Sequence, residues 1–171
     1  MILCGNLPEP LAAARDLVLR EAAYIDQRRW VEWIALFTWD CEYWIPAWKA
    51  DGTLASDPNA ELSHLYYANR GGLEDRIARI ESGRSPASHP PPRTTHIIGN
   101  LWSIDAAAED RIAAATSWVS HVFFPLLHQS HAFFGQTEYV LLKQDDAWRI
   151  HRKKVVLQND YIETALDIYC L

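Results

Sequence analysis

The stretch Arg93-Thr94-Thr95-His96-Ile97-Ile98-Gly99-Asn100-Leu101 follows three consecutive prolines and has the composition of a β-strand. Strict alternation along this strand places His96, Ile98 and Asn100 on one face. Polar side chains at both ends of an otherwise apolar face are typical of a functional cavity, or of the remnant of one. The stretch therefore predicts a strand that lines the interior of the fold.

Length and charge limit the class of protein. The chain has 171 residues, enough for one domain with a sizeable core, and we expect residues 1–171 to form that single domain. Aromatic residues make up 12% of the chain, and we expect part of this apolar load to face a partner. The net charge of −6 argues against a nucleic-acid partner. The basic run at residues 149–154 is interpreted as a solvated or ion-paired strand face.

The cysteines and the apolar runs bear on the cell compartment. Cys4, Cys41 and Cys170 are odd in number and far apart, so they fit neither a disulfide framework nor a CxxC metal site. Charges interrupt every apolar run, and the first residues lack the basic and apolar regions of a signal peptide. The sequence predicts a soluble cytoplasmic protein that does not enter a membrane.

The hydrophobic patterns predict helices first and strands afterwards. Apolar residues at intervals of three and four predict an amphipathic helix over residues 11–25, with Glu21 on its apolar face. Further helices are predicted over residues 30–37 and 73–80, and strands over residues 41–48, 93–104, 111–124, 132–143 and 148–157. This order is typical of an α+β domain with helices on one face of a curved sheet.

The predicted strand over residues 111–124 is apolar on both faces. Trp118 lies on one of them, and Val119 and Phe123 lie on the other. A single layer of helices covers one face and leaves the second exposed. The pattern therefore predicts an oligomer.

Ligands for a metal or a cofactor are scarce in this sequence. His121, His128 and His131 come nearest to a cluster, but no carboxylate lies close to them, and we interpret them as loop and surface histidines. Three isolated cysteines cannot supply the paired Cys and His ligands of a Rieske cluster. There is also no glycine-rich phosphate loop and no serine nucleophile elbow. We expect no cofactor and no metal in this chain.

Acid–base chemistry remains possible. Asp26, at the end of the first predicted helix, and His96 could meet across a pocket and move a proton next to a carbonyl. Together with Glu21 and Asn100 they form the candidate cavity. The alternative, which we favour, is structural: His96 is hydrogen-bonded in a packed core, and Asp26 caps the helix that begins near Trp30.

Four motifs resemble the β (small) subunits of aromatic-ring-hydroxylating dioxygenases, and the benzoate and anthranilate branch in particular. They are the W-x-x-W-x-x-L-F-x-x-D-x-x-Y-W-x-P run over residues 30–46, LYYANRGGLEDRIARI over 65–80, PRTTHIIGNL over 92–101 and WRIHRKKVVLQND over 148–160. Together these motifs span most of the chain.

This resemblance implies a nuclear transport factor 2-like (cystatin-like) cone and a partner α subunit. The α subunit would hold the Rieske [2Fe-2S] cluster and the mononuclear non-haem iron, and would add O2 to an aromatic carboxylate. The small subunit would be structural, with no catalytic residue of its own. It would assemble as a trimer within an α3β3 hexamer.

Polar residues of the family motifs are assigned to structure. Asp75, Arg76 and Arg93 are expected to form bidentate arginine–carboxylate pairs that fix a loop or an interface. Trp118 and Phe123 are candidates for the same structural or interface role.

Two other functions remain open. The same cone serves dehydratases, isomerases and polyketide cyclases, so the runner-up is a stand-alone enzyme that uses Asp26 and His96. A third possibility is a non-catalytic module that binds a small molecule.

Overall fold

The computed structural model describes residues 8–83, 90–105, 108–162 and 166–171. Its elements, in chain order, are α1 (Glu9–Asp26), α2 (Trp30–Ile34), β1 (Phe37–Pro46), β2 (Ser63–Tyr67), α3 (Arg70–Glu81), β3 (Arg93–Ser103), β4 (Arg111–Phe124), β5 (Gln129–Gln144), β6 (Ala147–Leu157) and the short 3-10 turn η2 (Ile168–Cys170). No described helix is long and apolar enough to cross a membrane.

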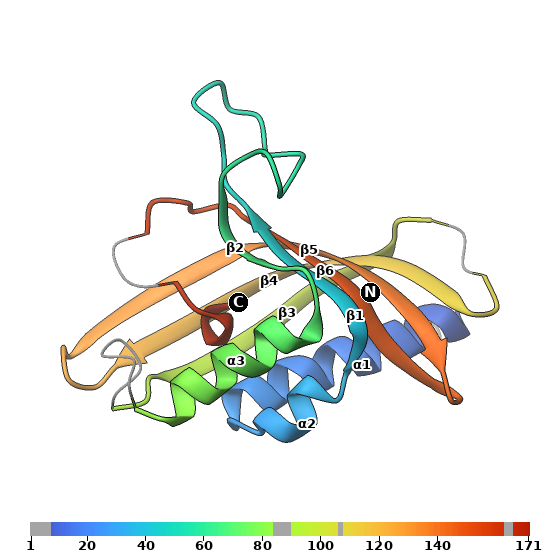
Figure 1. The fold of residues 1–171 in the computed structure, drawn as a ribbon, viewed down its shortest axis with the longest axis horizontal. Coiled ribbons are helices and arrows are strands. Elements are labelled where there is room, and N and C mark those ends of the chain that lie inside the picture. Colours follow the sequence, from blue (N-terminus) through green and yellow to red (C-terminus); the bar gives the residue numbers. More distant parts are fainter. Residues whose placement is uncertain (1–7, 84–89, 106–107, 163–165) are drawn as a thin grey trace, which may run out of the picture.

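The strands form one curved sheet in the order β2-β1-β6-β5-β4-β3. Neighbouring strands are antiparallel except for β1 and β6, which run parallel. All three α-helices lie along one side of this sheet (Figure 1). Helix α1 packs across β3, β4 and β6, and α3 packs against β1 and β2. The predicted α+β class is confirmed, with the core between the helices and the concave face of the sheet.

Helix α1 follows directly from its sequence. Its buried positions are Ala14, Leu17, Val18, Glu21, Ala22 and Ile25, which repeat at intervals of three and four. Pro10 stands in its first turn, where a missing backbone N–H removes no helical hydrogen bond. Glu21 lies on the apolar face, as predicted, and needs a partner inside the protein.

Three elements in the N-terminal half differ from the sequence prediction. The second helix ends at Ile34, and β1 begins at Phe37, several residues before the predicted start at Cys41. Strand β2 was missed because its five residues are all half-buried and show no alternation. Its pairing with β1 includes a hydrogen bond from the Trp44 indole N–H to Ser63 Oγ at 2.8 Å.

A β-bulge interrupts strand β3. Ile98 pairs with Trp118 and Leu101 pairs with Thr116, so Gly99 and Asn100 together face one residue of β4. The bulge reverses the alternation beyond Ile98, and Asn100 is exposed. The prediction that Asn100 lines the cavity is therefore wrong, because strict alternation assumed a regular ladder.

Candidate functional site

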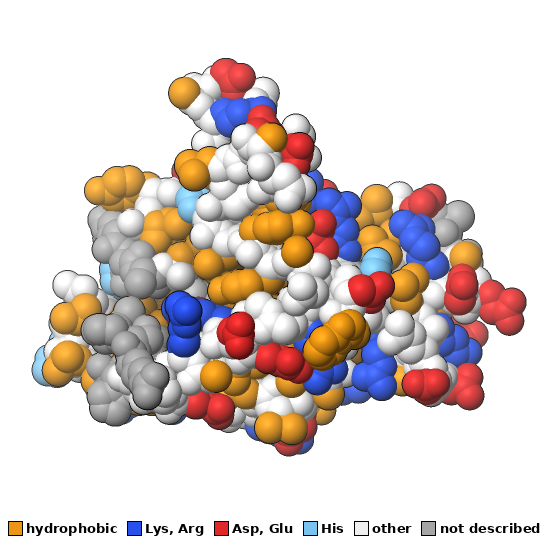
Figure 2. Space-filling view, in the orientation of Figure 1, with side chains coloured by type: hydrophobic (Ala, Val, Ile, Leu, Met, Phe, Trp, Pro, Cys, Tyr) orange, Lys and Arg blue, Asp and Glu red, His pale blue; other side chains and the backbone are white. Residues whose placement is uncertain are grey.

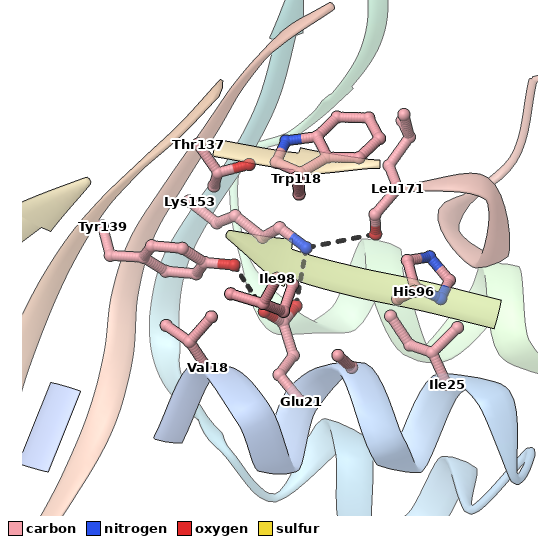
Figure 3. A pocket seen from close by; sticks show the side chains of 11 residues that line it. Val18, Glu21, Ile25, His96, Ile98, Trp118, Thr137, Tyr139, Lys153 and Leu171 are labelled. Atoms are coloured by element: carbon pink, nitrogen blue, oxygen red, sulfur yellow. Dashed lines mark hydrogen bonds and ion pairs between the residues drawn. The ribbon is translucent and has the colours of Figure 1, made fainter. Parts of the chain in front are cut away.

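A buried ion pair occupies the interior of the cone (Figure 3). Lys153 Nζ donates to Glu21 Oε1 at 2.7 Å and to the Leu171 carbonyl oxygen at 3.3 Å. The Tyr139 hydroxyl donates to the other carboxylate oxygen, Glu21 Oε2, at 2.7 Å. The side chains of Glu21 and Lys153 are 2% and 3% exposed. Both carboxylate oxygens thus have a donor, which a buried charge requires.

Strand pairing places Lys153 between two aromatic rings. Tyr43 on β1 and Tyr139 on β5 both stand opposite Lys153 of β6, and its ammonium lies 5.2 Å and 5.9 Å from the two ring centroids. Burial raises the pKa of both tyrosines well above the ordinary value, and the Glu21 carboxylate raises it further. Both rings are therefore neutral, and the Tyr139 hydroxyl acts as a donor.

The basic run on β6 is divided between the two faces of the sheet. Arg152 pairs with Glu42 at 2.8 Å, and the Lys154 ammonium lies 3.7 Å from Glu138, so these two fit the predicted ion-paired face. Lys153 does not, because it points into the core. The interpretation of the whole run as a surface face was wrong at this residue.

Asp26 and His96 meet at one end of the same interior. Asp26 Oδ1 accepts a hydrogen bond from Thr94 Oγ1 at 2.8 Å and lies 2.7 Å from His96 Nδ1. Asp26 Oδ2 accepts from the backbone N–H of His96 at 2.9 Å. Partial burial raises the pKa of Asp26, but the hydrogen bonds from His96 and Thr94 outweigh it and hold the pKa below the ordinary value. Asp26 is therefore an ionised acceptor.

The structural role proposed for Asp26 at the next helix is not observed. Arg29 occupies the N-cap position of α2, and no side chain makes a capping hydrogen bond there. Asp26 instead joins the end of α1 to β3, since its partners Thr94 and His96 lie on that strand. The carboxylate thus fixes the helix against the sheet.

A small cavity lies between these two polar groups. The side chain of His96 is 3% exposed, and its Nε2 atom has no hydrogen-bond partner among the described residues; the same holds for the indole nitrogen of Trp118. Both residues line the cavity, together with Glu21, Tyr139 and Lys153 of the buried ion pair and with Val18, Ala22, Ile25, Ile98, Thr137 and Leu171. Its free volume of about 10 Å³ is close to that of one water molecule.

Leu171 forms one wall of the cavity, and the residues before it are held firmly in the fold. Ile168, Cys170 and Leu171 are buried, and Ser120 Oγ donates a hydrogen bond to the carbonyl oxygen of Cys170. Because Lys153 also donates to Leu171, this segment is tied to both β4 and β6. No molecule of substrate size fits beside His96 in this arrangement.

Metal ligands do not converge in the part of the chain that the structure describes. Within residues 8–83, 90–105, 108–162 and 166–171, no group of three or more His, Cys, Asp or Glu side chains is placed to hold a metal ion. His121 lies exposed on β4, and His128 stands in the turn before β5 with a φ of 52°. These residues do not fit the ligand set of a Rieske cluster or of a mononuclear iron site.

The family-motif residues differ in their surroundings. Arg76 Nε donates to Asp167 Oδ1 at 2.8 Å, and Arg76 Nη2 pairs with Asp167 Oδ2, which is the expected bidentate pair. It joins α3 to the segment that leads into η2. Asp75, by contrast, is exposed. Arg93 is also exposed and lies over the ring of Phe123, 5.8 Å from its centroid, so the predicted carboxylate pair of Arg93 is corrected to a cation–π contact.

The two aromatic candidates lie on opposite faces of β4. Trp118 is 7% exposed and points into the cone, so it cannot serve at an outer interface of the chain. Phe123 is half-buried on the convex face beneath Arg93. Alternation in the sequence predicts that they lie on different faces, but it does not indicate which face is outside.

Sequence reasoning missed Lys153, Tyr139 and Leu171 as parts of the interior. A signal existed for Lys153, because it alternates in step with the apolar residues Val155 and Leu157 of the same strand. No comparable signal exists for Leu171, whose position depends on the course of the whole chain.

The fold defines a nuclear transport factor 2-like cone, with helices on one side of a curved sheet. The chain matches the family described as the ring hydroxylating beta subunit over residues 20–164. It is 39% identical to the small subunit of 2-halobenzoate 1,2-dioxygenase from Burkholderia cepacia, covering 89% of this chain and 90% of that protein. It is 36% identical to the beta subunit of toluate 1,2-dioxygenase from Pseudomonas putida, covering 92% and 95%.

A solved structure supports the same assignment. The beta subunit of benzoate 1,2-dioxygenase from Burkholderia mallei superposes with a TM-score of 0.76 at 32% identity, covering 94% of this chain and 97% of that one. This chain belongs to the family of ring-hydroxylating dioxygenase β subunits. The resemblance read from the four sequence motifs is confirmed.

Proposed function

We propose that this chain is the small subunit of a dioxygenase that adds O2 to an aromatic carboxylate, and that the chemistry takes place in its α subunit. The names of the similar proteins carry the substrate class, because halobenzoate, toluate and benzoate are all aromatic carboxylates. We propose that residues 1–171 form a single domain of this β-subunit type.

The iron centres belong to the α subunit in this proposal. The described part of this chain brings no suitable ligand set together, so a Rieske cluster and a mononuclear iron would need ligands from another polypeptide. Cys41 and Cys170 are buried free thiols, and burial raises the pKa of the first to about 11 and of the second to about 12. Such thiols are poor metal ligands and suit the reducing cytoplasm, where we place the protein.

The convex face of the sheet supports assembly. Ile97, Val119 and Phe134 form one row across β3, β4 and β5, because each stands opposite the next in the strand pairing. Ile97 is 56% exposed and Phe134 is 46% exposed, on a face that no described α-helix covers. An apolar row of this kind is typical of an interface. We propose that it is buried when three copies join three α subunits as α3β3.

Charge supports a protein partner rather than a nucleic acid. On the face that Figure 2 shows, Lys and Arg side chains are interspersed with Asp and Glu among apolar ones. Nucleic-acid binding requires a basic face, whereas this chain carries a net charge of −6.

The Asp26–His96 pair favours the runner-up function, because a buried carboxylate–imidazole pair is the arrangement of a general base. The small volume of the cavity argues against the runner-up function. A cavity of about 10 Å³ does not admit a ketone or lactone beside His96 Nε2. We therefore assign the pair to the attachment of α1 to β3.

Purification of the tagged chain from its native host tests this function. We expect a coloured complex that contains iron, a larger chain with Rieske absorption, and O2 uptake with an aromatic carboxylate. The isolated chain should contain no stoichiometric iron or zinc. A colourless homo-oligomer that dehydrates or isomerises a ketone would instead support the runner-up.

A further inference from the structure

We propose that the groove between helices α2 and α3 is a docking site for a basic amphipathic helix of a partner protein. The groove is lined by the α2 residues Trp30, Val31 and Ile34 and by the α3 residues Glu74, Ile77 and Glu81. Its free volume is about 160 Å³, and it is open to solvent without any rearrangement of the chain. The proposal goes beyond the dioxygenase role and does not depend on it.

The floor of the groove is apolar. Helices α2 and α3 pack against each other on the side of the sheet that carries the helices (Figure 1). Trp30, Ile34 and Ile77 are buried, so their side chains belong to the core and form a fixed floor. Val31, by contrast, is 79% exposed at the edge of the groove. An exposed apolar side chain beside an apolar groove is typical of a protein interface.

Two carboxylates border the groove on α3. Glu74 and Glu81 lie on the same side of this helix, two turns or about 10 Å apart along its axis, with Ile77 and Ala78 of the groove between them. Glu74 is already paired with Arg70 at 2.8 Å. Glu81 forms no ion pair with any residue that the structure describes. The groove therefore carries an uncompensated negative charge at its Glu81 end.

The position of Glu81 is unfavourable for α3 itself. Glu81 is the last residue of this helix, where the unpaired carbonyl groups carry a partial negative charge. A carboxylate at this end destabilises the helix, whereas a cation stabilises it. A lysine or arginine of a partner would compensate both the carboxylate and the helix terminus. The charge of the groove thus selects a basic partner.

The spacing of these features matches a helix. An apolar floor between two carboxylates that are two helical turns apart is complementary to a helix with apolar residues between two basic residues at the same spacing. The pattern Lys-x-x-Leu-Leu-x-x-Lys places all four side chains on one face of such a helix. The groove lies on the opposite side of the sheet from the apolar row of Ile97, Val119 and Phe134, so its partner does not compete for that row.

A peptide with this pattern tests the site on the full chain. The probe is a fluorescein-labelled, alanine-rich helical peptide that contains Lys-Ala-Ala-Leu-Leu-Ala-Ala-Lys, and its binding is followed by fluorescence anisotropy at about 0.1 M salt. We expect saturable binding of this peptide and no binding of a second one in which glutamates replace both lysines. A third peptide, in which alanines replace both leucines, should bind about tenfold more weakly than the first, because it lacks the apolar contacts.

Two variants of the chain locate the site. Glu81→Lys should weaken binding of the lysine peptide about tenfold or more, because it replaces an attraction by a repulsion. This variant should fold, since a cation at the C-terminal end of a helix is favourable. Val31→Ser should weaken binding about threefold without a change of charge. Glu109→Lys, at an exposed residue outside the groove, makes the same change of net charge as Glu81→Lys and should bind as the wild type does.

Three results would overturn the proposal. One is the absence of saturable binding of the lysine peptide to the wild type. Another is an equal loss of binding in Glu81→Lys and Glu109→Lys, because the peptide would then respond to the net charge of −6 rather than to the groove. The third is a smaller sedimentation coefficient for Glu81→Lys than for the wild type, since a second copy of this chain would then be the occupant of the groove.

Discussion

The interior of the cone and the convex face lie on the two sides of the same sheet and are opposite in character. Inside, the charged residues Glu21 and Lys153 are compensated and almost fully buried. Outside, the apolar side chains of Ile97 and Phe134 are about half exposed. The usual distribution of polar and apolar groups is thus reversed at both places.

This difference shows which surface serves the chain itself and which serves a partner. The interior groups connect α1, β5, β6 and the C-terminal residues, so the isolated fold depends on them. Among the described residues, the outer row makes no comparable connection. Substitutions inside should therefore reduce stability, and substitutions outside should reduce assembly.

The largest effect is expected for Lys153→Met. It leaves the Glu21 carboxylate buried with one donor lost, and the free energy of unfolding should fall by about 3–5 kcal/mol. Urea denaturation measures this loss. The matched control Lys154→Met removes an ammonium on the same strand whose side chain is 20% exposed, and it should cost about 1 kcal/mol or less. Equal losses of unfolding free energy in the two variants would show that the buried Glu21–Lys153 pair contributes no more than a surface ion pair.

His96→Ala should cost roughly 1–3 kcal/mol in the free energy of unfolding, because it leaves the partly buried Asp26 carboxylate with fewer donors. Turnover of the reconstituted dioxygenase complex should be retained once the variant has folded. A fall in turnover of a hundredfold or more would instead make His96 a catalytic acid or base.

Phe134→Ser and Ile97→Ser test the outer face. Each should weaken self-association by at least tenfold, or about 1.4 kcal/mol, as expected for an apolar residue in an interface. The free energy of unfolding of the monomer should change by about 0.5 kcal/mol or less. Sedimentation velocity measures the association, and Leu126→Ser provides an exposed leucine outside the row as control. Unchanged sedimentation of both variants would show that the convex face is not part of the assembly interface.

Asp26 adds a pH dependence to the interior. Its pKa in the folded protein lies below the ordinary value of 3.8, so the folded state binds fewer protons than the unfolded state. The resulting stability is present above that ordinary value and is lost as the pH falls through the lower folded pKa. Unfolding measured between pH 6 and about pH 2.5 should show a steeper acid loss for the wild type than for Asp26→Asn. Parallel curves would contradict the assignment.

Arg93→Ala should have the smallest effect on the isolated chain. The guanidinium is exposed and lies over Phe123, a contact worth about 0.5–1 kcal/mol. Thermal unfolding measures this change. A loss of several kcal/mol would indicate a buried ion pair, as the sequence analysis predicted, rather than the surface contact in the structure.

The strand over residues 93–101 shows how far local reasoning reaches. Its strand character and the inward position of His96 follow from composition and alternation. The outward turn of Asn100 does not, because it arises from a bulge stabilised by Thr116 and Ser117 of the neighbouring strand. A pattern of period two carries no information on where the ladder gains a residue.

Periodicity in the sequence determined that Glu21 lies on the apolar face of α1, and the motifs determined the family. The sequence did not determine the partner of Glu21, because Lys153 lies 132 residues further along the chain. Nor did it determine that Leu171 lines the cone or that Trp118 faces inward rather than outward. Local sequence patterns predict which side chains become buried. The pairing of distant side chains depends on the curvature and strand order that bring them into contact.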